Sequence, residues 1–106
     1  MSGISASLSG LQTSALSVAV ASQNVANVNS VDFKARRLEQ QTLADGGVQA
    51  TGVQESQAPA NSARGSNVDL ATEAVSLSTD KVTYESNLQF LQAQTAMLGM
   101  AMDMKA

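Results

Sequence analysis

The sequence predicts a mainly helical protein, with two long terminal helices paired as a coiled-coil hairpin and a small β-hairpin element between them. Near both ends, apolar residues recur at alternating spacings of four and three, as in a helix that packs along another. The middle instead holds two short stretches around an Asp-Gly-Gly turn signal. The chain therefore divides into an N-terminal axial helix, a β-hairpin element with its loop, and a C-terminal axial helix, at residues 1–31, 32–66 and 67–106.

The first helix is expected from Ile4 to about Asn29. Residues 1–31 contain no Asp, Glu, Lys or Arg, whereas an exposed helix normally carries charges on its wet face. Two interpretations stay open: a helix enclosed by other protein in an assembly, or a Ser- and Ala-rich helix or arm that simply lacks charge. The apolar seam of this helix is formed by Ile4, Leu8, Leu11, Ala15, Val18, Ser22 and Val25.

The middle of the chain, residues 33–57, is expected to form two short strands around Asp45, Gly46 and Gly47. These residue types tolerate the positive φ angles that tight hairpin turns require. Gly52 is expected to mark a β-bulge. Pro, Gly, Ser and Asn then cluster in residues 58–66, which predicts a loop.

The last helix is expected from about Val68 to Met104, and at about 1.5 Å per residue it would reach roughly 50 Å. Asp69 is a candidate N-cap, and Glu73 lies near the positive end of the helix dipole. Residues 86–102 carry no charge, so an antiparallel pairing would bring the two uncharged stretches together at one end. The seam of this helix is formed by Leu70, Ala74, Leu77, Lys81, Tyr84, Leu88, Leu91, Thr95, Leu98 and Met102.

Composition argues against several classes of function. The net charge of −3 disfavours a nucleic-acid-binding module, which would normally carry a basic face. The chain has no Cys and no His, so the commonest general bases, nucleophiles and transition-metal ligands are missing, and neither enzyme activity nor a cofactor is expected. No run of about 18 consecutive apolar residues occurs, so no membrane-spanning segment is expected. Only 3% of residues are aromatic, so the core should be thin and partner proteins should supply part of the stability.

Three local patterns could carry chemistry, and each has a plainer interpretation. Residues 78–81 have the S-x-x-K spacing of a serine nucleophile, but the companion motifs are missing, so we expect a helix surface. Lys34, Arg36 and Arg37 could bind a phosphate or form the solvated start of a strand. The C-terminal methionines are expected to fill helix contacts rather than bind a soft metal. They are Met97, Met100, Met102 and Met104.

The stretch LSGLQTSALSVAVASQNVANVNSVDFKARR resembles the N-terminal signature of bacterial flagellar axial proteins, the rod and hook group. That signature is a helix followed by a stretch like N-x-A-N-x-N-T-x-G-F-K. Asp32 stands where the family usually has glycine, which puts the geometry of the turn after the helix in question. The matching residues are Asn24, Ala26, Asn27, Asn29, Phe33 and Lys34.

The C-terminal stretch SNVDLATEAVSLSTDKVTYESNLQFLQAQTAMLG is similar to the family pattern N-V-D-L…E…Q-R-x-Y-x-x-N…M-L-G. Lys81 and Val82 stand where Gln-Arg is usual. The middle run GGVQATGVQESQAP is similar to a run in a member from the proximal rod. The matching C-terminal residues are Asn67, Val68, Asp69, Leu70, Glu73, Tyr84, Asn87, Met97, Leu98 and Gly99.

The resemblance implies a structural subunit of the flagellar basal-body rod, exported by the flagellar type III apparatus and assembled helically around a channel in the periplasm. Its expected partners are other rod proteins, copies of itself and the export apparatus, with no nucleic acid and no small-molecule substrate. The seam residues expected to hold the helices together and to support assembly are Leu8, Leu11, Val18, Val25, Leu70, Leu77, Tyr84, Leu88, Leu91 and Leu98.

An alternative is a small secreted helical-hairpin protein of another secretion system. Proteins of that kind commonly have a Trp-x-Gly turn between their helices. This chain contains no tryptophan, and its connector is β-like and longer than a tight turn. The rod interpretation therefore fits the sequence better.

Overall fold

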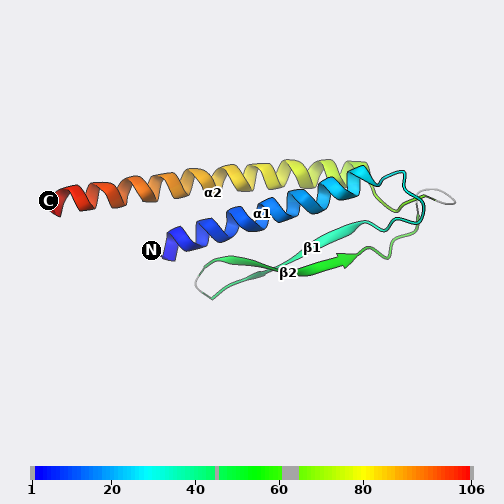
Figure 1. Ribbon diagram of the computed structural model, residues 1–106, viewed down its shortest axis with the longest axis horizontal. Helices are drawn as coiled ribbons and strands as arrows, with labels where there is room; N and C mark the ends of the chain where they lie inside the picture. The colour runs from blue at the N-terminus through cyan, green and yellow to red at the C-terminus, as the bar shows by residue number, and fades with distance from the viewer. Residues whose placement is uncertain (1, 45, 61–64, 106) are drawn as a thin grey trace.

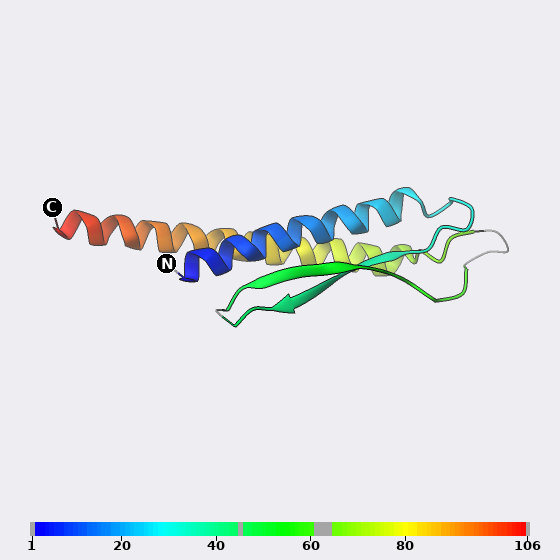
Figure 2. The same ribbon diagram turned by 60° about the horizontal axis from the view of Figure 1, so that its bottom comes forward.

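The computed structural model describes residues 2–44, 46–60 and 65–105. Two antiparallel helices lie side by side, and a two-stranded antiparallel hairpin runs along them against the N-terminal helix (Figures 1 and 2). The molecule is a rod of 68 × 23 × 14 Å with a radius of gyration of 18.1 Å, whereas a compact domain of this length would have about 13 Å. The elements are α1 (Ser2–Ala26), β1 (Arg36–Thr42), β2 (Val48–Glu55) and α2 (Leu70–Lys105).

Helix α1 ends at Ala26, three residues before the predicted end. The side chain of Asn27 donates a hydrogen bond to the carbonyl of Gln23 at 2.8 Å, beside the bond from its own backbone N–H at 3.1 Å. The next amide, that of Val28, bonds the carbonyl of Val25 three residues back instead of four. Asn27 therefore ends the helix, because its side chain competes with backbone N–H groups for the last carbonyls of the helix.

Asp32 makes the turn that leads from α1 towards β1. It has a φ of 57°, in the left-handed region. Glycine adopts this region freely, and Asp tolerates it better than most residues because its short polar side chain can bond locally. Asp32 therefore makes this turn in the left-handed conformation, at some cost in backbone strain.

The predicted β-hairpin is confirmed, including its bulge. Glu39 pairs with Gly52 and the next residue, Gln40, pairs with Ala50, so Thr51 is the extra residue of the bulge. The turn is closed by a 2.7 Å bond from the amide of Leu43 to the carbonyl of Gly47. Gly46 in this turn has a φ of 95°, as the turn chemistry predicted, while Asp45 lies outside the described residues.

Helix α2 begins at Leu70 and continues for 36 residues, close to the predicted span. Asp69 caps it as predicted: its carboxylate accepts bonds from the amides of Ala71 at 3.0 Å and Thr72 at 3.4 Å. The loop predicted at residues 58–66 has no helix or strand in its described part, and residues 61–64 lie outside the described residues.

The core is thin, as the composition predicted. Among the described residues, the buried hydrophobic side chains are Leu11, Ala21 and Val68. Buried polar side chains outnumber them, so much of the interior is joined by hydrogen bonds and little by apolar packing. These polar residues are Ser7, Thr13, Ser14, Asn24, Ser66 and Glu73.

Candidate assembly surface

Two glycines of α1 lie directly against side chains of α2. Gly3 lies against the side-chain amide of Gln94, and Gly10 lies against that of Asn87. A Cβ atom on Gly10 would lie 2.6 Å from Nδ2 of Asn87, which is closer than real Cβ contacts. A glycine costs a helix about 1 kcal/mol relative to alanine, and here the close approach of α2 explains its presence.

Further along α1, the helices are joined by hydrogen bonds between side chains. The hydroxyl of Ser17 donates to Oδ2 of Asp80 at 2.7 Å, and Nδ2 of Asn24 donates to Oε1 of Glu73 at 2.8 Å. Together with the two glycine contacts, these positions are seven residues apart along both helices. The helices therefore meet along a line of polar and glycine residues, which we call the polar line.

The ten predicted seam residues do not make up the polar line. Leu11 is buried, and Val18, Leu77 and Leu91 are half-buried. Three of the α1 seam residues immediately follow members of the polar line in the sequence, so they lie beside it on the helix. The other six are between 36% and 52% exposed: Leu8, Val25, Leu70, Tyr84, Leu88 and Leu98.

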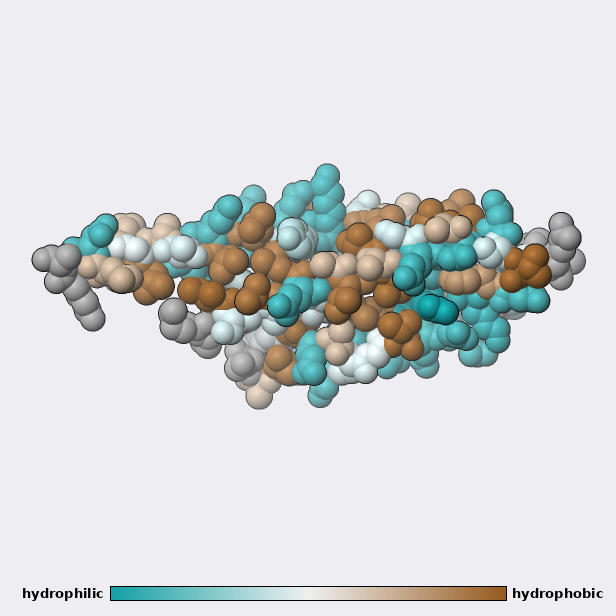
Figure 3. All heavy atoms as spheres, in the orientation of Figure 1, coloured by the Kyte–Doolittle hydropathy of each residue, from teal (hydrophilic) through white to brown (hydrophobic). Residues whose placement is uncertain are grey.

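Exposed apolar side chains continue along the helix pair beyond the seam. Figure 3 shows them as a band that follows the length of the molecule, interrupted by polar groups. On α2, Val75, Val82 and Phe90 are each more than half exposed as well. A small protein rarely leaves so much connected apolar surface in water unless it contacts another molecule.

The end of the helix pair at which both termini lie carries the uncharged stretches, as predicted. Figure 1 shows the N- and C-termini at the same end of the rod. Residues 1–31 and 86–102 contain no charged side chain. The single ion pair found among the described residues, Lys81 with Glu85 at 4.0 Å, lies in the charged half of α2 and is exposed, so it contributes little stability.

At the other end, Asn24 joins three elements. Its side chain forms two bonds with the backbone of Arg36: Nδ2 donates to the carbonyl at 2.7 Å, and Oδ1 accepts from the amide at 2.9 Å. Its bond to Glu73 reaches α2 as well. Asn24 is 1% exposed, so these bonds are shielded from water and tie α1, β1 and α2 together.

Asn67 connects the segments that flank the two strands. Its Oδ1 accepts a bond from the amide of Ala35 at 2.5 Å, and its Nδ2 donates to the carbonyls of Ser56 at 3.1 Å and Ala58 at 3.0 Å. The hydroxyl of Ser66 donates to the carbonyl of Val28 at 2.5 Å. The start of β1, the end of β2 and the approach to α2 are thus held in one network, which we call the junction.

The structure separates the residues that carry the family resemblance. Asn87 lies far along α2 against Gly10, and Asn29 is exposed. Phe33 is half-buried, with the guanidinium carbon of Arg36 lying 5.9 Å from the centre of its ring. Five other motif residues lie at or beside the junction: Asn24, Asn27, Asn67, Val68 and Asp69.

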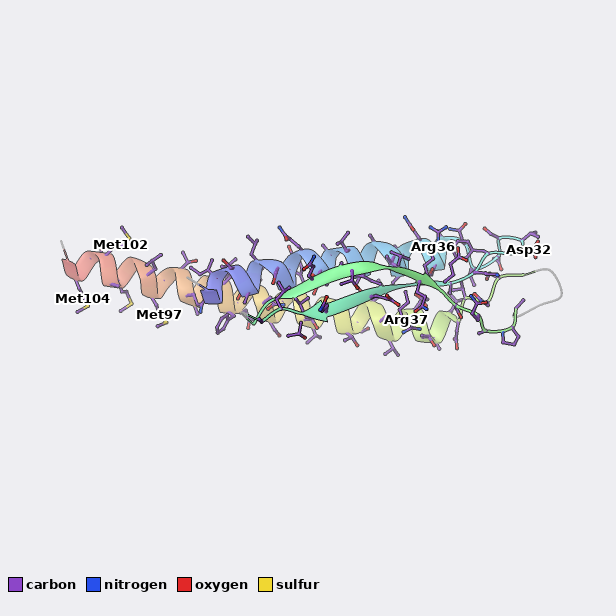
Figure 4. The ribbon with its side chains drawn as sticks, turned by 90° about the horizontal axis from the view of Figure 1, so that it is seen from below. Asp32, Arg36, Arg37, Met97, Met102 and Met104 are labelled. Carbon is purple, nitrogen blue, oxygen red and sulfur yellow. The ribbon has the colours of Figure 1, made fainter. Side chains whose placement is uncertain are left out.

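Helix α2 extends past α1. Because Gln94 lies against Gly3, residues 95–105 continue beyond the start of α1, and we call them the overhang. No other described element runs beside the overhang in Figures 1 and 2. Met102 projects from one side of it, and Met97 and Met104 project from the other (Figure 4).

The acidic and basic side chains in the described part of the chain are dispersed. No group of three or more His, Cys, Asp or Glu side chains there could hold a metal ion. The basic cluster does not converge on one point, since Arg36 and Arg37 lie on opposite sides of β1 (Figure 4). An open groove of about 320 Å³ beside the junction is lined by both arginines and by acidic residues, so it carries mixed charge.

Helix α1 differs from the expectation that no segment of the chain could span a membrane. By length and composition alone, Gly3–Ala26 could cross a membrane, although it lacks a long unbroken apolar run. Core helices of soluble proteins and signal sequences share this property. In this structure the helix forms hydrogen bonds to its neighbours through polar side chains, including Ser9 and Thr13 to the backbone of Val48.

The arrangement is suited to contacts between proteins: a rigid junction at one end, and exposed uncharged helix faces at the other. No family model matches the chain, and no curated protein matches it. The function of this surface is therefore inferred from its own residues and geometry.

Proposed function

We propose that this protein is a structural subunit of the bacterial flagellar basal-body rod, most similar to the proximal rod protein FlgC. It would leave the cytoplasm through the flagellar type III apparatus and assemble helically in the periplasm, transmitting torque and enclosing a channel. The observation that carries this proposal is the pair of long helices, with exposed leucines and with uncharged stretches that lie together at the end where both termini are. Such a surface suits a subunit enclosed by copies of itself and by other rod proteins.

The seven-residue spacing of the helix contacts supports coiled-coil pairing of the terminal helices. The polar line would fix the register of the pair, because each polar side chain has a single partner at one position along the opposite helix. The half-exposed seam residues beside it, such as Leu88 and Leu98, would then be free to pack against neighbouring subunits. Their burial would contribute about 25 cal/mol per Å² of apolar surface.

The junction supports a mechanical role. Torque passes through a subunit only if its parts keep their relative positions under load. Asn24 and Asn67 hold the hairpin against both helices through six side-chain bonds of 2.5–3.1 Å. The middle run with the FlgC-like pattern forms the turn, β2 and the segment after it, and its matching residues are Gly47, Val48, Gly52, Val53, Glu55 and Pro59.

The proposal is tested in the bacterium that carries the gene. Deleting the gene should abolish swimming and leave basal bodies without a complete rod in electron micrographs. Replacing Leu88 by Glu should have the same effect, because a charge would be placed in an uncharged packing surface. Ser78→Glu is the matched control, since Ser78 is a polar, exposed residue on the same helix within its charged half, and this strain should swim.

Two results would count against the proposal in different ways. A deletion strain that swims and builds complete rods would exclude the rod function. Normal rods in the Leu88→Glu strain would exclude the assembly surface while leaving the function open to another surface. Circular dichroism of both purified variants checks that each one still folds.

A further inference from the structure

We infer that two free copies of this chain pair tail to tail, with their overhangs packed against each other as antiparallel helices. The site is residues 95–105 of α2, and the partner is a second copy of the same segment. This inference concerns the free subunit and does not depend on the proposed rod function.

The overhang carries five long apolar side chains, which cover more than half of its circumference. Its side chains Met97, Met100, Met102 and Met104 are between 65% and 87% exposed, and Leu98 is 39% exposed. Successive residues of a helix are turned by about 100°, so Met97, Met100 and Met104 share one side of the helix and Leu98 and Met102 share another, while Thr95, Gly99 and Asp103 occupy the remaining face. A helix face that carries long apolar side chains is normally buried. Within the described chain, nothing runs beside this one.

A hollow at the base of the overhang can receive a side chain. Ile4, Gln94, Met97 and Leu98 line an open cavity of about 270 Å³ where α1 begins. If two overhangs of about 16 Å lie antiparallel, the tip of one reaches the base of the other. The second copy's Met104, the most exposed of these methionines, would then lie over this cavity.

The geometry already used by α2 favours a second copy as the occupant. Along the polar line, α2 presents one residue every seven to the antiparallel helix α1, ending at Gln94. The next position in that series is Ala101, which has no α1 residue opposite it. A second overhang lying where α1 would continue places the two Ala101 residues opposite each other at a twofold axis.

Charge also permits self-pairing. Identical surfaces that carry like charges repel each other, but residues 86–102 carry none, and the charged residues at the tip of the overhang, Asp103 and Lys105, have opposite signs. A twofold arrangement closes after two copies, so it buries both overhangs without leaving a free end. The contact is far smaller than the roughly 800 Å² per partner of a standard stable interface, so we expect reversible association.

Because the chain has no cysteine, single cysteines report the arrangement directly. Under mild oxidation, Ala101→Cys should give a disulfide-linked dimer, since each cysteine faces its own copy. Val75→Cys, which is exposed in the other half of α2, should stay largely uncrosslinked under the same conditions. A head-to-tail contact would bring Ala101 to a different residue, and Ala101→Cys would then not crosslink.

Sedimentation of the chain without cysteine measures the same pairing in its native form. The average mass should rise from monomer to dimer with concentration, and Met97→Glu should weaken the association at least about tenfold. Val75→Glu is the control, because Val75 is 66% exposed and Met97 is 67% exposed on the same helix. A mass that stays monomeric, or crosslinking no greater at residue 101 than at residue 75, would overturn the inference. Neither result bears on the swimming test of the rod proposal.

Discussion

At the scale of single residues, asparagine side chains hold the helices and the hairpin together, a role that apolar side chains have in most small proteins. An asparagine side chain offers one acceptor and two donor hydrogens in one plane, so it can replace a neighbouring strand or cap a helix. Asn24 uses this capacity fully, with two bonds to Arg36 and one to Glu73. The run of asparagines after the uncharged helix is therefore structural: it ends the helix at Asn27 and connects it to β1 at Asn24.

Replacing Asn24 by Ala should lower the free energy of unfolding by about 2–4 kcal/mol. The substitution leaves the amide and carbonyl of Arg36 and the carboxylate of Glu73 without their partner, and each buried group that loses its bond costs about 1–3 kcal/mol. Urea unfolding followed by circular dichroism measures the change.

Asn29 provides the control for this measurement. It belongs to the same asparagine run but is exposed, so Asn29→Ala should change the free energy of unfolding by less than about 0.5 kcal/mol. Equal losses in the two variants would mean that the network around Asn24 does not stabilise the junction.

At the scale of elements, the helices meet through small and polar residues instead of leucines. The alternating four-three spacing of apolar residues predicted which segments are helical and that they pair. It misplaced the contact between them by one residue, because Gly10, Ser17 and Asn24 let the backbones approach where a leucine would hold them apart. The reason for a glycine in this helix appears only when the two helices are packed together, since in an isolated helix a glycine is destabilising.

Gly10 and Asn87 should behave as a coupled pair. Gly10→Ala places a Cβ atom 2.6 Å from Nδ2 of Asn87, so we expect it to destabilise the helix pair despite its higher helix propensity. Combined with Asn87→Ala, which removes the obstructing amide, the same substitution should instead stabilise by up to about 1 kcal/mol. Urea unfolding of the four members of this double-mutant cycle gives the coupling energy. Additive effects would show that the two residues do not touch in solution.

At the scale of the whole molecule, a rod of 68 Å has too little interior to be stable by apolar burial alone. Three buried hydrophobic side chains among the described residues are few for a chain of 106. The exposed band along the helices and the overhang hold the apolar surface that a compact fold would have placed inside. Stability should therefore depend on association.

The midpoint of thermal unfolding should accordingly rise with protein concentration, because anything that binds only the folded chain stabilises it by mass action. Differential scanning calorimetry over a hundredfold range of concentration measures this rise. Met97→Glu should make the midpoint nearly independent of concentration, since it removes the contact proposed for the free subunit. A midpoint that does not move in the unmodified chain would show that one copy holds its fold unaided.

The sequence by itself determined the elements: periodicity and caps placed both helices, turn chemistry placed the hairpin and its bulge beside Gly52, and missing charges marked one end of the rod. These signals are local, because backbone geometry and solvation act over a few residues. The tertiary structure decided which residues meet: the polar line, the partners of Asn24 and Asn67, and the overhang beyond Gly3. Of these contacts, Asn24 with Glu73 and Asn67 with Ala35 join residues 49 and 32 positions apart, and no local pattern specifies the register that brings them together.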